Sequence, residues 1–272
     1  MNTPIGVFDS GVGGLTVARE LFSILPSEDV VYFGDVGRYP YGIRSKEIIT
    51  KFTIQDIRFL LEHQVKFIIC ACNTAASVAL DDVRKNFDVP MVGVIRPGAE
   101  AAAKVTKNGR IGVIGTHATI NSNAYARFVH EIDEDIKVFS LACPLFVPLA
   151  EEGYIEKEAT YLITRDYLQT MHDVEVDTLI LGCTHYPLLK NVIADVMGDN
   201  VTLIDSGEET AKAAFKMLTV QGLLSTDSTQ IPGPEGEHKF YVSDVPEKFS
   251  LVATRFLGRS VDRITRVDVS GY

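Results

Sequence analysis

The sequence predicts an α/β protein made of two similar halves, each a parallel sheet covered by helices. Short, partly β-branched apolar runs alternate with segments whose apolar residues recur at helical spacing, a pattern typical of buried parallel strands joined by helices. The same order of runs returns about 110 residues later. A period this long indicates a duplicated domain and not a solenoid repeat.

In the first half, the apolar runs predict four strands, at residues 5–8, 30–33, 67–71 and 91–95. Each run is short and uninterrupted by charge, which suits a strand buried on both faces. Helical spacing of apolar residues predicts helices at 15–25 and 48–61.

The strands of the second half are predicted from the repeat, at offsets between 106 and 111 residues. Four matches in chain order are hard to obtain by chance, so we expect a pseudo-two-fold relation between the halves. Ligands of open α/β sheets bind beyond the carboxyl ends of the strands, which predicts an active site in the cleft between the halves. The matched strands are residues 111–113, 138–140, 178–183 and 201–205.

Beyond residue 206 the pattern no longer follows the repeat. We expect a helix at 208–218, a Gly-, Pro- and Ser-rich loop at 222–238, a strand at 239–242, a helix at 246–257 with Asp244 as its cap, and a strand at 261–269. These elements cannot bury much core alone, so the tail is predicted to pack on the first half. The predicted domains are residues 1–96 plus 207–272, and residues 97–206.

Composition limits the classes of function. The chain has 272 residues, 46% of them hydrophobic and 23% charged, as in ordinary globular proteins. Its apolar runs fall short of the roughly 20 residues of a membrane span, and its N-terminus does not resemble a signal peptide. A net charge of −10 without a Lys/Arg-rich run disfavours nucleic acid and anionic membranes as partners.

A glycine-rich turn at residues 9–14, Asp-Ser-Gly-Val-Gly-Gly, follows the first strand and opens a helix. Its glycines could let backbone amides approach a ligand. Thr16 stands where a dinucleotide fingerprint has its third glycine, and no P-loop lysine follows. A match to the phosphate loops of actin-like kinases is weak, and a tight turn with a helix cap is the plain structural alternative.

Two cysteines, Cys72 and Cys183, stand at the same point of each repeat, directly after a buried strand. A single cysteine there would usually be a small core residue, as we expect for Cys70 and Cys143. Two at equivalent places favour chemistry, and a helix N-terminus lowers a thiol pKa and favours the thiolate. No Cys-x-x-Cys spacing is present, so we do not expect zinc. Without an export signal, the thiols should be free in the cytoplasm.

Two thiols that face each other across a cleft suit inversion of a carbon centre. One face must lose a proton while the opposite face gains one, and two acid/base groups are the direct solution. His185 lies two residues after Cys183 and could assist it, although a structural histidine is the alternative.

Several segments resemble those of the glutamate racemase family, over residues 5 to about 258. The resemblance implies a cofactor-independent racemase that interconverts L- and D-glutamate for peptidoglycan synthesis. It also implies a cytoplasmic homodimer whose first domain is completed by the C-terminal segment. The segments are Asp-Ser-Gly-Val-Gly-Gly-Leu at 9–15, Gly-Asp at 34–35, Pro-Tyr-Gly at 40–42, Ala-Cys-Asn-Thr-Ala at 71–75, Cys-Pro-Leu at 143–145 with Glu151, and Gly-Cys-Thr-His-Tyr-Pro at 182–187.

The resemblance also implies residue roles. Cys72 would take the proton from D-glutamate with the help of Asp9, and Cys183 would take it from L-glutamate with the help of His185. Neither a cofactor nor a metal is implied. The chain begins almost at the first strand, so we do not expect the activation by a cell-wall precursor that some members achieve through an N-terminal extension. The implied substrate-binding residues are Asp9, Ser10, Tyr41, Gly42, Asn73, Thr74, Glu151, Thr184 and His185.

Three other functions stay open at this level. A racemase of aspartate or another amino acid would share the two-cysteine scaffold, and a panel of substrates would separate it. A non-catalytic ligand-binding or partner-inhibiting protein would keep the cleft without needing the thiols. A sugar-kinase-like ATPase would bind nucleotide tightly.

Overall fold

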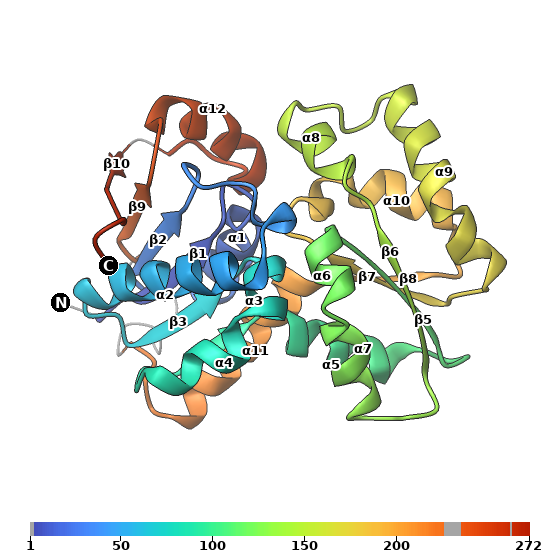
Figure 1. Cartoon of the computed structure of the whole chain (residues 1–272), viewed down its shortest axis with the longest axis horizontal. Coiled ribbons are helices and arrows are strands. Elements are labelled where there is room, and N and C mark those ends of the chain that lie inside the picture. Colours follow the sequence, from blue (N-terminus) through green and yellow to red (C-terminus); the bar gives the residue numbers. More distant parts are fainter. Residues whose placement is uncertain (1–2, 226–234, 262) are drawn as a thin grey trace.

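The structure, a computed structural model, describes residues 3–225, 235–261 and 263–272. In this part of the chain the strands form two sheets, one in each half of the molecule (Figure 1). The first sheet has the order β10-β9-β2-β1-β3-β4 and the second the order β6-β5-β7-β8. Their strands are β1 (Ile5–Asp9), β2 (Val30–Gly34), β3 (Phe67–Cys70), β4 (Met91–Gly93), β5 (Arg110–Gly115), β6 (Lys137–Ala142), β7 (Thr178–Gly182), β8 (Thr202–Asp205), β9 (His238–Val242) and β10 (Ile264–Arg266).

The predicted repeat is confirmed in the strand order. In the first half β1 lies between β2 and β3, with β4 next to β3. In the second half β5 lies between β6 and β7, with β8 next to β7. The strand pairs β1–β2, β1–β3, β5–β6 and β5–β7 are parallel, as the α/β class requires.

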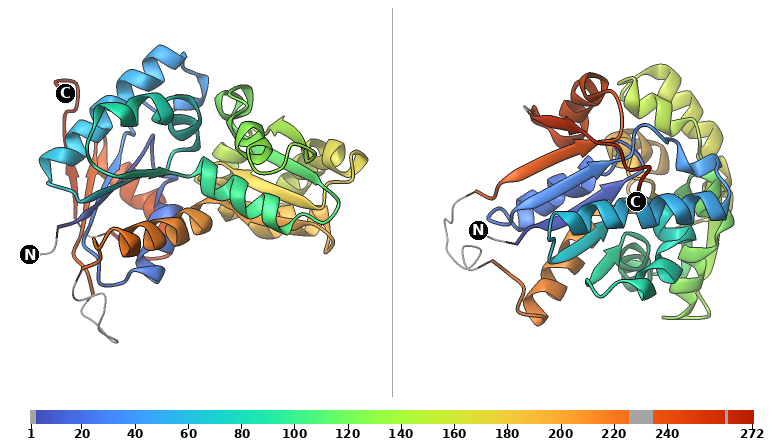
Figure 2. Two further views of the ribbon diagram at one scale, coloured as in Figure 1. Left: turned by 90° about the horizontal axis from the view of Figure 1, so that it is seen from below. Right: turned by 60° about the vertical axis from the view of Figure 1, so that its left-hand side comes forward.

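Helices cover both faces of the sheets. In the first half α2 lies on one face of the sheet, and α1 packs with α11 and α12 on the other (Figure 2). Every residue of β1, β2, β3 and β7 is therefore buried. The helices are α1 (Leu15–Ile24), α2 (Lys46–Glu62), α3 (Asn73–Val78), α4 (Leu80–Val83), α5 (Ile95–Val105), α6 (His117–Asn121), α7 (Ala124–His130), α8 (Phe146–Glu151), α9 (Glu158–Asp173), α10 (Lys190–Met197), α11 (Ser206–Val220) and α12 (Pro246–Leu257), with short 3₁₀ turns at Tyr41–Ile43, Arg84–Asn86 and Tyr186–Leu189.

The C-terminal segment extends the first sheet. Strand β9 pairs with β2 and β10 pairs with β9, both in parallel, so this segment lies beside the N-terminal strands (Figure 1). The domain boundaries at 96/97 and 206/207 remain our proposal. None of the helices in the described residues is long and apolar enough to cross a membrane.

Two details of the tail were predicted wrongly. The last strand is shorter than residues 261–269, because pairing with β9 covers only Ile264–Arg266. Asp244 does not cap α12: Val245 is the residue before the helix, and Asp244 Oδ1 accepts a hydrogen bond from the Val245 amide at 2.9 Å. Of the loop predicted at 222–238, residues 226–234 lie outside the described residues.

Candidate active site

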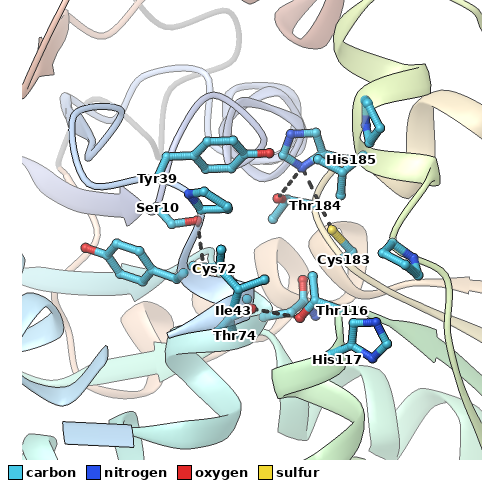
Figure 3. A pocket seen from close by; sticks show the side chains of 17 residues that line it. Ser10, Tyr39, Ile43, Cys72, Thr74, Thr116, His117, Cys183, Thr184 and His185 are labelled. Carbon is cyan, nitrogen blue, oxygen red and sulfur yellow. Dashed lines mark hydrogen bonds between the residues drawn. The ribbon is translucent and has the colours of Figure 1, made fainter. Parts of the chain in front are cut away.

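The carboxyl ends of the central strands of both sheets open onto one cavity of about 240 Å³. Ser10 follows β1, Cys72 follows β3, Thr116 follows β5 and Cys183 follows β7, and all four line this cavity. Cys72 and Ser10 lie on one side, and Cys183 lies on the other (Figure 3). The cavity stands where an open α/β sheet binds its ligand, and both halves contribute to it.

Cys72 is the residue directly before α3, 4% exposed. Its sulfur accepts a hydrogen bond from the Ala75 amide at 3.5 Å and lies 3.4 Å from the Ser10 hydroxyl. The strand-to-helix turn after β3 thus presents the thiol to the cavity while the helix N-terminus supports its sulfur.

The expectation of a lowered pKa is wrong for Cys72. Burial, together with the nearby Asp9 carboxylate, raises the pKa of this thiol to about 12. The hydrogen bonds from Ser10 and Ala75 act in the opposite direction but are outweighed. Loss of hydration exceeds the effect of one helix N-terminus here, so Cys72 is a protonated thiol at neutral pH.

Cys183 takes part in a chain of polar contacts. Its sulfur lies 3.8 Å from His185 Nδ1, and His185 Nε2 lies 3.0 Å from Glu151 Oε1 at the end of α8. Burial by itself would lower the pKa of His185, but the contacts with Cys183 and Glu151 raise it to about 10. His185 thus links the Cys183 sulfur to the Glu151 carboxylate.

Asp9 ends β1 and is 1% exposed. Its Oδ2 accepts a hydrogen bond from the Gly11 amide at 2.8 Å, and burial raises the pKa of the carboxyl. In the described part of the chain, Asp9 Oδ1 and Asn73 Oδ1 are buried acceptors without a hydrogen-bond partner. Buried acceptors are rarely left unsatisfied, and an ammonium group is the kind of donor that would satisfy them.

The glycine-rich turn of residues 9–14 serves close packing between the halves. A Cβ on Gly13 would lie 2.2 Å from Thr184 Oγ1 and 2.6 Å from the His185 ring. Nearby, the Thr16 hydroxyl donates to the Thr184 carbonyl at 2.9 Å. The turn therefore sets how near the first half comes to Cys183 and its neighbours.

Gly13→Ala tests this packing. The added methyl group must displace Thr184 and the His185 ring, and misplacement of a catalytic group by about 1 Å can cost roughly 10²-fold in rate. We expect a fall of this order in kcat with a folded protein, checked by steady-state kinetics and thermal unfolding. Gly271→Ala is the matched control, because its Cβ would meet open space, and activity equal to the control would contradict this role.

Most of the predicted binding residues meet at the cavity. Its lining includes Ser10, Gly42, Asn73, Thr74 and Thr184. Among the rest, Tyr41 borders the cavity, but its hydroxyl points into a buried cluster with Asp35 and Asp56. Glu151 reaches the cavity through its contact with His185.

Several residues that line the cavity were missed, among them Tyr39 and Thr116. Tyr39 stacks on His185 with ring centroids 6.3 Å apart, and burial raises the pKa of its hydroxyl. The Thr116 hydroxyl lies 3.0 Å from that of Thr74 in the opposite half. The repeat could have found Thr116, because it follows Ser10 by 106 residues. Tyr39 carries no such signal.

All four cysteines fall in the described residues, and they are buried and free. Cys70 and Cys143 are completely buried among apolar residues, which confirms their assignment to packing. A group of three or more His, Cys, Asp or Glu side chains able to hold a metal ion does not occur in the described ranges.

Comparisons with known proteins place this arrangement in a family. Residues 13–214 match the sequence profile of the Asp/Glu/hydantoin racemase family. The glutamate racemase of Geobacter metallireducens is 48% identical over 265 residues, 97% of this chain and 96% of that protein. The crystal structure of glutamate racemase from Francisella tularensis, in complex with D-glutamate, is similar with a TM-score of 0.91, 42% identity and coverage of 100% and 99%. That from Bacillus anthracis has a TM-score of 0.92 at 41% identity, with coverage of 98% and 97%.

Proposed function

Since the chain belongs to the Asp/Glu/hydantoin racemase family, we propose that it is a glutamate racemase, an isomerase that interconverts L- and D-glutamate. The observation that carries this function is the pair of buried thiols, Cys72 and Cys183, at equivalent strand ends on opposite sides of one cavity. Inversion of the α-carbon needs an acid/base group on each face, and this pair supplies both.

In the proposed reaction, the α-carbon loses a proton from one face and gains a proton on the opposite face. With L-glutamate bound, the Cys183 thiolate takes the α-proton, which leaves the electron pair on the carbon and its carboxylate. The Cys72 thiol then donates its proton to the opposite face and becomes the thiolate. The reverse assignment serves D-glutamate. The raised pKa of Cys72 supports its assignment as the thiol that donates a proton when L-glutamate is bound.

The polar groups of the cavity can hold glutamate without neutralising the thiolate. We propose that the unpaired oxygens of Asp9 and Asn73 receive the ammonium group. The hydroxyls of the buried residues Ser10, Thr74 and Thr184 would donate to the carboxylates. Glu151 acts through His185 in this assignment.

We also propose that the protein is a cytoplasmic homodimer and that its D-glutamate enters peptidoglycan. These statements follow from the family resemblance.

The function is tested by the loss of the circular-dichroism or polarimetric signal of L-glutamate without any added cofactor. We expect full activity after exhaustive chelation and in the absence of pyridoxal phosphate, because the two thiols handle the α-proton themselves. Activity that vanished on chelation and returned with a metal would contradict this mechanism. A panel that includes aspartate fixes the substrate, and faster racemisation of aspartate would replace glutamate in the assignment.

Glu151→Gln tests the role of the His185 contact. Removing the carboxylate takes away an interaction that raises the pKa of His185, so the imidazolium should lose its proton at a lower pH than in the unaltered protein. The alkaline limb of the kcat/KM profile should shift to lower pH, while activity near pH 7 is less affected. An unchanged alkaline limb would show that His185 does not support Cys183 in this way.

A further inference from the structure

A cluster of buried polar side chains lies behind the part of the cavity wall formed by residues 39–43. Asp35 and Asp56 are 0% exposed and Tyr41 is 1% exposed. Arg38 joins the two carboxyls, because its Nε donates to Asp35 Oδ2 at 2.6 Å and its Nη2 donates to Asp56 Oδ1 at 2.8 Å. The catalytic assignments above make no use of this cluster.

The Tyr41 hydroxyl touches both carboxyls but carries a single proton. Its oxygen is within hydrogen-bond distance of Asp35 Oδ2 and lies 3.0 Å from Asp56 Oδ2. The Tyr41 hydroxyl can donate its single proton to only one of these two carboxyl oxygens. A hydrogen bond between the Tyr41 oxygen and the other carboxyl therefore needs a proton on that carboxyl. One of the two carboxyls is therefore protonated and donates to the Tyr41 oxygen.

The surrounding donors decide which carboxyl carries the proton. Asp35 accepts hydrogen bonds from Arg38 and Tyr41 and, at Oδ1, from the Ser243 hydroxyl at 2.7 Å. Among the described residues, Asp56 has Arg38 as its one other hydrogen-bond donor. Asp35 accepts more hydrogen bonds and is thus the carboxylate, and Asp56 is the neutral acid. Burial and the charge of Asp35 also raise the pKa of Asp56 well above its usual range.

This assignment leaves the cluster electrically neutral, with one carboxylate and one guanidinium. Two carboxylates would put an uncompensated negative charge in the protein interior, which is costly. They would also place a carboxylate oxygen 3.0 Å from a hydroxyl oxygen without a proton between them.

We propose that Asp56, as a neutral carboxylic acid, is a positioning residue that holds the Tyr41–Gly42 wall of the cavity in place for substrate binding. Gly42 stands across the cleft from Thr116, whose Cβ would lie 3.0 Å from a Cβ on Gly42. A shift of Tyr41 would therefore change the space between the halves. The effect on binding rests on the proposed racemase function, whereas the position of the proton rests on hydrogen-bond geometry alone.

Infrared spectroscopy tests the proton directly. Near neutral pH, the carbonyl stretch of a protonated carboxylic acid should be present in the unaltered protein and missing in Asp56→Asn. Asp82→Asn is the matched control, because the Asp82 side chain is 60% exposed and paired with Lys46, and it should leave the band unchanged. A difference spectrum without this band would overturn the proposal.

Kinetics test the positioning role. Asp56→Ala removes one hydrogen-bond partner from Tyr41 and one from Arg38, so that Asp35 alone ties the Tyr41 hydroxyl, and we expect KM to rise roughly 10-fold while kcat falls much less. Asp56→Asn should restore most of the loss, because its amide donates to the Tyr41 oxygen and its carbonyl accepts from Arg38. Asp35→Asn removes the anion and should raise KM as Asp56→Ala does.

The opposite ranking, with Asp35→Asn tolerated and Asp56→Asn as harmful as Asp56→Ala, would overturn the assignment. A fall in kcat at constant KM in Asp56→Ala would contradict positioning of the binding wall. If the unaltered protein does not racemise glutamate, the proposed function fails, but the infrared band still decides whether Asp56 carries the proton. If Asp56→Ala does not fold, Asp56→Asn and the infrared band remain decisive.

Discussion

Replacing either Cys72 or Cys183 with serine is expected to abolish racemisation, with kcat/KM reduced at least about 10³-fold. A serine hydroxyl is far too weak an acid to form the alkoxide base at neutral pH. Each thiol serves one face of the substrate, so the loss of either one stops the reaction. The loss should be the same in both directions, because the two enantiomers have equal free energy in solution.

Cys143→Ser is the matched control for these variants. Cys143 is also completely buried, but it lies outside the residues that line the cavity, so most activity should remain. Circular dichroism of the protein and thermal unfolding establish that all three variants are folded. Substantial racemisation by either active-site variant would contradict the two-thiol mechanism.

Asp9→Asn is expected to lower kcat by roughly 10²-fold, the usual scale for a positioned acid/base group. Asparagine keeps the size of the side chain and can still accept from the Gly11 amide, but it removes the charge that acts on the Cys72 thiol. The equilibrium between the thiol and the thiolate of Cys72 is then shifted, and Cys72 exchanges its proton with the substrate less effectively.

Steady-state kinetics separate this role from substrate binding. Normal kcat with a raised KM would show that Asp9 only holds the ammonium group and has no part in proton transfer. Asp82→Asn controls for the loss of one negative charge from the protein, because Asp82 is exposed and does not line the cavity.

The repeat made much of the fold predictable from sequence. Residues 5–8 and 111–113 occupy equivalent central strands, β1 and β5, because buried parallel strands leave continuous apolar runs that can be aligned. The same alignment brought Cys72 and Cys183 to equivalent strand ends. Secondary structure and the burial of strands depend on short segments of the sequence, so local patterns predict them.

Side-chain electrostatics could not be predicted in the same way. The pKa of Cys72 depends on how completely the folded chain removes water and on the charge of Asp9, and neither is a property of the local motif. The Glu151–His185 contact and the direction of the Tyr41 hydroxyl likewise join residues from different elements. Such pairs are set by tertiary packing, which no short pattern encodes.

The fate of the α-proton in heavy water tests the two-base mechanism most directly. In the unaltered protein, the product enantiomer should carry solvent deuterium, because its proton comes from the opposite thiol. Cys183→Ser should retain exchange of D-glutamate alone, and Cys72→Ser exchange of L-glutamate alone. Direct transfer of the substrate's own proton into product, or equal exchange of both enantiomers in both variants, would show instead that a single base serves both faces.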